Sequence, residues 1–123
     1  MNGFPDHIHF LGIAGIGVSA LAQVAQARGA AVSGSDPQAD PHLNPAIARL
    51  LAGGAQIATE HRAENLNDTV DLVVASAAIH SDNPEIRAAQ ERGIRIVTRT
   101  DKLIIISLMF QGHQDSNTLA LIH

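Results

Sequence analysis

A glycine-rich stretch near the start of the chain, FLGIAGIGVSALA, combines residue types that suit an anion site. Gly12, Gly15 and Gly17 fall within six positions, and an apolar, helix-forming segment follows directly. The dinucleotide fingerprint G-x-G-x-x-G would place glycine at 12, 14 and 17, so Ala14 makes the match partial. N–H groups at the start of the helix, with the Ser19 hydroxyl, would hold a diphosphate. The alternative interpretation is a glycine-rich turn that serves only packing. Because this stretch lies between an expected strand and an expected helix, we favour the anion site.

Asp36 follows an apolar segment in VSGSD, about 20 residues after the glycine turn. In a nucleotide-binding sheet, a carboxylate at this point accepts hydrogen bonds from a ribose hydroxyl or a base N–H. The residues around Asp36 are also ordinary turn formers, which is the alternative interpretation. The spacing from the glycine turn favours ligand contact.

Two further segments carry candidate ligand contacts because each follows an expected strand. In ASAAIHSDNPE, Ser76 and Ala77 lie where a strand ends, so their polar groups would face the glycine turn. We interpret the following NPE as a helix cap and first turn. In IATEHRAENL, His61 would stack on or hydrogen-bond a base, and an exposed loop histidine is an equally good interpretation.

Seven histidines raise the question of a metal site. His7 and His9 share one face of an expected strand, but no third histidine or carboxylate stands nearby at a ligand-like spacing. We therefore predict no metal site and interpret both as packed or solvated side chains. No nucleophile elbow or pair of carboxylates suited to acid–base work is evident, so no catalytic residue is expected. The predicted chemistry is binding.

The candidate residues depend on strands and helices that alternate along the chain. The expected strands are 7–11, 31–35, 56–59, 70–76 and 94–98, and the expected helices are 16–28, 45 to about 53, 84–92 and a last one capped by Thr100 and Asp101. Short, continuously apolar strands between helices predict an α/β fold with a parallel sheet covered on both faces. Such a sheet binds ligands beyond the carboxyl ends of its strands.

Composition excludes several classes of function. The 123 residues carry a formal charge of −4 with a single lysine, so no basic stripe is present for nucleic acid. The absence of cysteine excludes disulfides and thiolate metal sites and fits a cytoplasmic protein. The amino terminus lacks the pattern of a signal peptide, and the apolar run 103–110 is too short to span a bilayer. We expect neither a nucleic acid nor a membrane as partner.

Taken in order, HFLGIAGIGVSALA, VSGSD, HRAENL and DLVVASAAIHSDNPEIRAAQERGIRIV resemble the amino-terminal domain of the Mur ligases, in particular those that join L-alanine to UDP-N-acetylmuramate. The family's usual first motif is G-x-G-G-x-G-M-S, from which Ala14 and Val18 depart. The resemblance runs from His7 to Leu103. It implies a Rossmann-like three-layer domain over residues 1–103, with a five-stranded, mostly parallel sheet.

The resemblance also implies a ligand, UDP-N-acetylmuramate, and a set of contacts. The implied UDP-sugar-binding residues are Gly12, Ala14, Gly15, Ile16, Gly17, Ser19, Asp36, His61, Ser76 and Ala77. The glycine turn would hold the diphosphate, Asp36 would meet the uracil or ribose, and Ser76 with Ala77 would complete the pocket near His61.

Intact ligases of this family use ATP and magnesium, and their central ATPase domain carries a G-T-x-G-K-T-T loop. This sequence contains no Gly-Lys-Ser/Thr, and its single lysine, Lys102, follows an aspartate. We therefore expect this chain alone to bind no ATP or magnesium and to catalyse no ligation. A central ATPase domain and a carboxy-terminal domain would be its partners in the intact enzyme.

Residues 104–123 do not match the family's continuation, and we expect a terminal helix or strand and a tail there. The apolar run 103–110 would either cover the sheet or support a homodimer. Two other functions stay open: an NAD-type domain of an oxidoreductase or sensor, and a non-catalytic fragment or interaction module.

Overall fold

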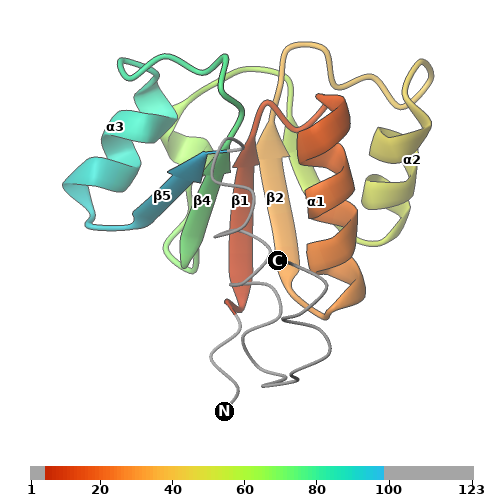
Figure 1. The fold of residues 1–123 in the computed structure, drawn as a ribbon, viewed down its shortest axis with the longest axis horizontal. Coiled ribbons are helices and arrows are strands. Elements are labelled where there is room, and N and C mark those ends of the chain that lie inside the picture. Colours follow the sequence, from red (N-terminus) through yellow and green to blue (C-terminus); the bar gives the residue numbers. More distant parts are fainter. Residues whose placement is uncertain (1–4, 99–123) are drawn as a thin grey trace, which may run out of the picture.

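Five parallel strands form the centre of the computed structural model, which describes residues 5–98. In chain order the elements are β1 (His7–Leu11), α1 (Ile16–Ala27), β2 (Ala31–Ser35), α2 (Pro45–Ala52), β3 (Gln56–Ala58), the 3-10 helix η1 (Ala63–Asn65), β4 (Leu72–Ala75), α3 (Pro84–Glu91) and β5 (Arg95–Thr98). The strand order is β3-β2-β1-β4-β5, and every pairing is parallel. The predicted five-stranded α/β fold is confirmed (Figure 1).

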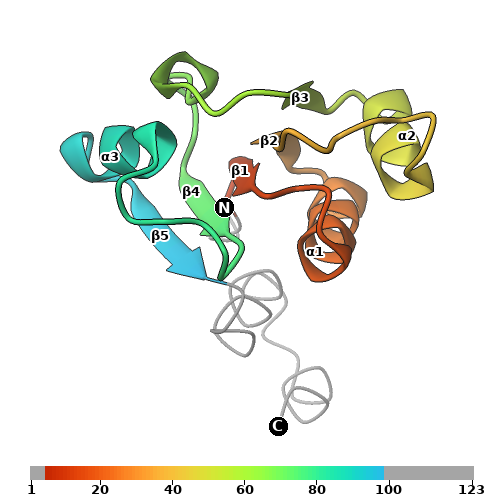
Figure 2. The same cartoon turned by 90° about the horizontal axis from the view of Figure 1, so that it is seen from above.

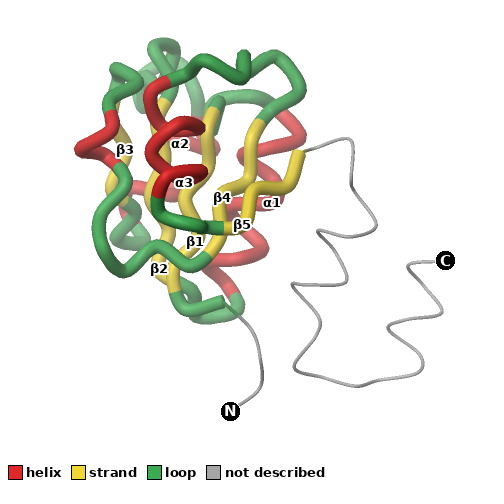
Figure 3. Tube along the Cα trace, turned by 90° about the vertical axis from the view of Figure 1, so that its left-hand side faces the viewer, coloured by secondary structure: helices red, strands yellow, loops and turns green. Residues whose placement is uncertain are grey.

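Helices cover both faces of the sheet, as the alternating pattern predicts. Seen from above, α1 and α2 lie on one side of the strands, and α3 with η1 on the other (Figure 2). Figure 1 shows the strands between these two layers, and Figure 3 looks onto the strands from the side of α3. On the side of α1 and α2, strand residues such as Ile8, Phe10 and Val74 pack with Val18 and Leu50 in one apolar core. Alternation along β1 turns the next side chains to the opposite layer.

The helix boundaries follow signals that are readable in the sequence. Asn44 caps α2 by accepting from the N–H groups of Ala46 and Ile47, with Pro45 in the first turn. Asn83 caps α3 in the same way by accepting from the Glu85 N–H at 2.9 Å. The 3-10 helix η1 was not predicted, and β4 is shorter than the expected strand 70–76. The expected last helix and the run 103–110 lie outside the described residues.

The order of the strands reverses between β1 and β4, so the segments that follow these two strands border a common crevice. Gly12 comes directly after β1 and has φ +78°, a left-handed conformation that favours glycine. A Cβ on Gly12 would lie 2.9 Å from the Cβ of Ser76, which follows β4. The glycine turn and the Ser76 segment are therefore in close contact at the carboxyl edge of the sheet.

Gly12→Ala should lower the free energy of unfolding by about 3 kcal/mol, because the new methyl group meets both a left-handed backbone and the Ser76 side chain. Gly29→Ala is the matched control: its φ is +95°, but nothing lies within 4 Å of the added Cβ. We expect it to cost only about 1 kcal/mol. Urea unfolding followed by far-UV circular dichroism measures both, and equal costs for the two variants would contradict the close contact.

Candidate functional site

The glycine turn joins β1 to α1 at the centre of the carboxyl edge. The Gly12 N–H donates to the Ser35 carbonyl at 2.9 Å, and the Gly15 N–H donates back to the Gly12 carbonyl at 3.0 Å. Gly15 occupies the N-cap of α1 and supplies no side-chain cap. The N–H groups of the first helical turn therefore remain available to an external acceptor, and the helix dipole favours an anion there.

Asp36 holds the glycine turn against the end of β2. Its Oδ2 accepts from the Ala14 N–H at 3.0 Å, and its Oδ1 accepts from the Gln38 N–H at 2.8 Å. Each carboxylate oxygen has a second lone pair, so Asp36 keeps capacity for a ligand donor. Asn44 adds a second link, because its Nδ2 donates to the Ala14 carbonyl at 3.3 Å. Within the turn that is predicted to hold a diphosphate, the Ala14 N–H donates to Asp36.

Three other predicted contacts, Ile16, Gly17 and Ser19, lie on the first turn of α1, and they differ in their exposure to solvent. The Ser19 side chain is buried, and its hydroxyl donates to the Ile16 carbonyl at 3.1 Å. It is therefore engaged within the helix rather than directed to the free N–H groups. Ile16 is 91 % exposed, which is unusual for so apolar a side chain. Gly17 is partly exposed in the same turn.

The segment after β4 lies across from the glycine turn, as predicted. The Ser76 N–H donates to the Leu11 carbonyl at 3.0 Å, which ties this segment to the end of β1. Its hydroxyl oxygen accepts from the Ala78 N–H at 3.2 Å. Ala77 is exposed at the turn. Gly12 and Ser76 are thus in contact at the carboxyl edge, where the strand order reverses.

His61 belongs to a buried polar network rather than to a free loop. Its Nδ1 lies 2.8 Å from the hydroxyl of Ser35, the last residue of β2, and 3.6 Å from Oε2 of Glu85. The side chain is 20 % exposed. Because Asp36 follows Ser35 directly, His61 lies beside the predicted ligand contacts at the same edge of the sheet.

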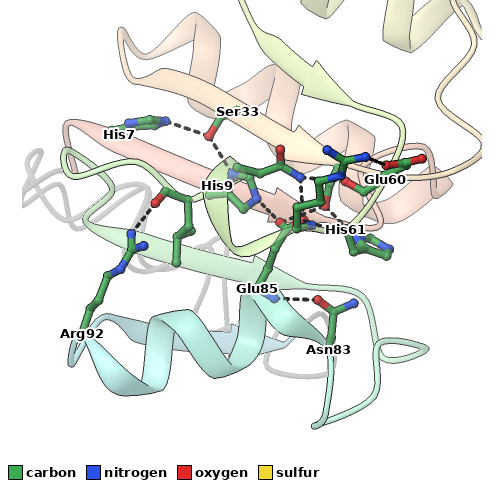
Figure 4. A network of polar contacts seen from close by, with 12 residues as sticks. His7, His9, Ser33, Glu60, His61, Asn83, Glu85 and Arg92 are labelled. Atoms are coloured by element: carbon green, nitrogen blue, oxygen red, sulfur yellow. Dashed lines mark hydrogen bonds and ion pairs between the residues drawn. The ribbon is translucent and has the colours of Figure 1, made fainter.

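The centre of this network is Glu85, which sequence reasoning assigned only to a helix turn. Its side chain is fully buried between α3 and the sheet (Figure 4). Oε1 lies 2.5 Å from Nε2 of His9 and accepts from the Ser35 hydroxyl at 2.9 Å. Oε2 accepts from the Arg62 N–H at 3.0 Å and from Nδ2 of Asn65 at 2.9 Å. Burial alone raises the pKa of Glu85, but these hydrogen bonds and the charge of His9 outweigh it and lower the pKa.

Two histidines and a serine extend the network toward the opposite end of the strands. Ser33 lies 2.7 Å from Nδ1 of His9 and 2.8 Å from Nε2 of His7, and His7 Nδ1 lies 2.8 Å from the Thr69 hydroxyl. Burial lowers the pKa of His7, the charge of His9 lowers it further, and Asp71 partly opposes both. His7 and His9 are thus packed side chains, as predicted. Within residues 5–98, no group of three or more acidic or histidine side chains could hold a metal ion.

The sequence contains a signal for this network. Histidines at 7 and 9 and serines at 33 and 35 recur with the two-residue period of a strand, so each pair shares a face. Polar residues in this pattern on buried parallel strands need partners, because unpaired polar groups in the core are costly. An acidic residue on the covering helix is the natural partner.

Comparison with known proteins identifies the family. A model described as the Mur ligase family, catalytic domain, matches residues 7–111. The chain belongs to the Mur ligase family.

Curated relatives place it near one branch of the Mur ligases. It is 42 % identical over 108 residues to a UDP-N-acetylmuramate–L-alanine ligase of Lachnospira eligens, covering 88 % of this chain and 23 % of the relative. A protein of the same name from Paraburkholderia phytofirmans is 44 % identical over 112 residues, covering 91 % and 23 %. The chain therefore spans about a quarter of the length of these relatives.

Solved Mur ligase structures share the fold. The chain resembles a UDP-N-acetylmuramate-alanine ligase from Thermotoga maritima with a TM-score of 0.69 and 36 % identity, over 78 % of this chain and 21 % of that one. A murein peptide ligase from Psychrobacter arcticus gives a TM-score of 0.70 and 31 % identity, over 82 % and 20 %. Together with the family match, these structures confirm the predicted amino-terminal Mur ligase domain. Within residues 5–98, no helix is long and apolar enough to cross a bilayer.

The buried network predicts how stability depends on pH. The pKa of His7 is lowered from 6.5 on folding, so the unfolded chain binds the additional proton and stability falls as the pH drops below about 6.5. The pKa of Glu85 is lowered from 4.5, so stability falls again as the pH drops below about 4.5. Urea unfolding at a series of pH values, followed by circular dichroism, should show both decreases.

His7→Gln should remove the decrease that begins near pH 6.5 and leave the one that begins near pH 4.5. His80→Gln, at an exposed loop position, serves as the matched control and should leave both in place. An unchanged upper decrease in His7→Gln would show that His7 is not its source.

Proposed function

We propose that this domain binds the uridine diphosphate part of UDP-N-acetylmuramate for a peptidoglycan-precursor ligase. The observation that carries the proposal is the uncapped start of α1, placed beside Asp36 and Ser76 where the strand order reverses. The substrate class comes from the names of the relatives, which are UDP-N-acetylmuramate–L-alanine ligases.

Each part of the proposed ligand has a chemically suitable partner. The diphosphate is paired with the free N–H groups of the first turn of α1, where the helix dipole favours negative charge. The remaining lone pairs of Asp36 accept from a ribose hydroxyl or from the imide N–H of uracil. His61 contacts the hydroxyl of Ser35, the residue before Asp36, and Ser76 with Ala77 follows β4 across from the glycine turn.

The chemistry of ligation is assigned to other parts of the intact enzyme. The sequence has no Gly-Lys-Ser/Thr loop and one lysine, so its residues do not fit the phosphates and magnesium of ATP. We therefore propose binding and orientation of the sugar nucleotide as the role of this domain, with ATP and L-alanine bound by partner domains. A cytoplasmic location accords with this role and with the absence of cysteine.

Isothermal titration calorimetry of the full 123-residue chain tests the proposal. We expect saturable heat with UDP-N-acetylmuramate and with UDP, and weaker binding of uridine, which lacks the diphosphate. Asp36→Asn replaces an acceptor with an amide donor and should weaken UDP binding at least about tenfold, because a charged hydrogen bond is worth about 1.5–3 kcal/mol.

Asp68→Asn is the matched control, since Asp68 is exposed in the loop before β4, next to Thr69, which contacts His7 at the opposite end of the strands from the site. It should bind UDP as the unmodified chain does. Heat with NAD alone would replace the proposal with a dinucleotide-binding domain of an oxidoreductase or sensor. No heat with any of the compounds would indicate a non-catalytic fragment or interaction module.

A further inference from the structure

Glu85 is buried with donors on both of its oxygens, which defines its protonation state. The Arg62 N–H and the Asn65 amide can only donate to Oε2. His9 and Ser35 converge on Oε1. Four converging groups around one buried carboxyl group stabilise the anion, which is an acceptor at both oxygens.

An anionic Glu85 determines the direction of the next hydrogen bond. The Ser35 hydroxyl has one proton, and that proton is donated to Oε1 of Glu85 at 2.9 Å. The Ser35 oxygen can then only accept at its 2.8 Å contact with Nδ1 of His61. Nδ1 of His61 must therefore carry a proton, and in the neutral ring Nε2 has the free lone pair.

From this chain of contacts we propose that Glu85 is a positioning residue that fixes, through Ser35, the Nδ1–H tautomer of His61. His61 then offers Nε2 as a hydrogen-bond acceptor at the carboxyl edge of the sheet. Among the described residues, Nε2 has no hydrogen-bond partner, and the side chain is 20 % exposed. A ligand group that meets it must be a donor, such as the imide N–H of a pyrimidine or a ribose hydroxyl. This last step rests on the proposed binding of a uridine nucleotide.

We expect Glu85→Gln to reverse the tautomer of His61, not only to remove hydrogen bonds from the network. The amide oxygen of the new glutamine must face the Arg62 and Asn65 donors, so its NH₂ group faces His9 and Ser35. That NH₂ donates to the Ser35 oxygen, and the Ser35 proton turns to Nδ1 of His61. The His61 proton then moves to Nε2, which becomes a donor. A purely structural role for Glu85 gives no reason for such a reversal.

Nitrogen-15 NMR of the imidazole rings in the labelled full chain tests the tautomer directly, at about pH 8, above the ordinary histidine pKa. The His61 signals are assigned by their loss in His61→Gln. The unmodified chain should show a protonated Nδ1 and an unprotonated Nε2, and Glu85→Gln should show the reverse. Glu64→Gln is the matched control: Glu64 is exposed on η1, and its replacement should change nothing.

Ser35→Ala provides a second test that keeps Glu85 in place, so a failure of Glu85→Gln to fold does not end the experiment. Without the Ser35 oxygen, the fraction of His61 protonated at Nε2 should rise. A His61 ring protonated mainly at Nε2 in the unmodified chain would overturn the proposal. The proposal would also be overturned if Glu85→Gln and Ser35→Ala both folded and both left the His61 tautomer unchanged.

Addition of UDP to the labelled chain tests the acceptor role. The Nε2 signal of His61 should shift on binding, and Glu85→Gln should bind UDP about tenfold more weakly. Binding of UDP without any change at Nε2 would overturn the acceptor role. Absence of UDP binding would overturn the proposed function, whereas the tautomer measured without ligand would still decide the role of Glu85.

Discussion

A fully buried carboxylate is the constraint on which this side of the domain depends. Removing a charge from water is costly unless donors replace the lost hydration. Glu85 obtains them from β1, β2, the Arg62 backbone and η1, so one side chain joins α3 to segments far apart in the sequence. Loss of any single donor leaves the charge less well compensated, which couples the position of α3 to the geometry of the sheet.

The polar network lies where the α/β pattern is incomplete. Between β3 and β4 the chain forms only the short helix η1, whereas α1, α2 and α3 cover the other connections. The strands beneath it carry His9, Ser33 and Ser35 instead of aliphatic side chains. Hydrogen bonds thus replace apolar packing on this part of the sheet, and they continue to His61 at the carboxyl edge. The same contacts that stabilise the fold therefore orient a side chain beside the candidate site.

The fold could be predicted from sequence because its signals are local. Asn44 with Pro45 and the apolar alternation of β1 specify their elements without reference to distant residues. The sequence also predicted which segments meet at the candidate site, because parallel strands bring the segments of Gly12, Asp36 and Ser76 to one edge of the sheet. The alternating histidines and serines signal a buried polar network, but that Glu85 is its centre could not be predicted, because its partners lie up to 76 residues away and depend on strand register. The burial of the Ser19 side chain likewise depends on how α1 packs on the sheet.

The departure of the glycine turn from the dinucleotide fingerprint has a physical explanation. At position 14, where the fingerprint has glycine, Ala14 donates its N–H to Asp36 and accepts from Asn44 through its carbonyl. Its backbone is thus engaged with β2 and the start of α2, and a side chain there is tolerated. In the fingerprint that glycine lets a pyrophosphate approach the backbone; here the uncapped first turn of α1 after Gly15 is the neighbouring segment with N–H groups not engaged by a side-chain cap. Asp36 therefore fixes, through one carboxylate, both its own turn at Gln38 and the turn that precedes this helix start.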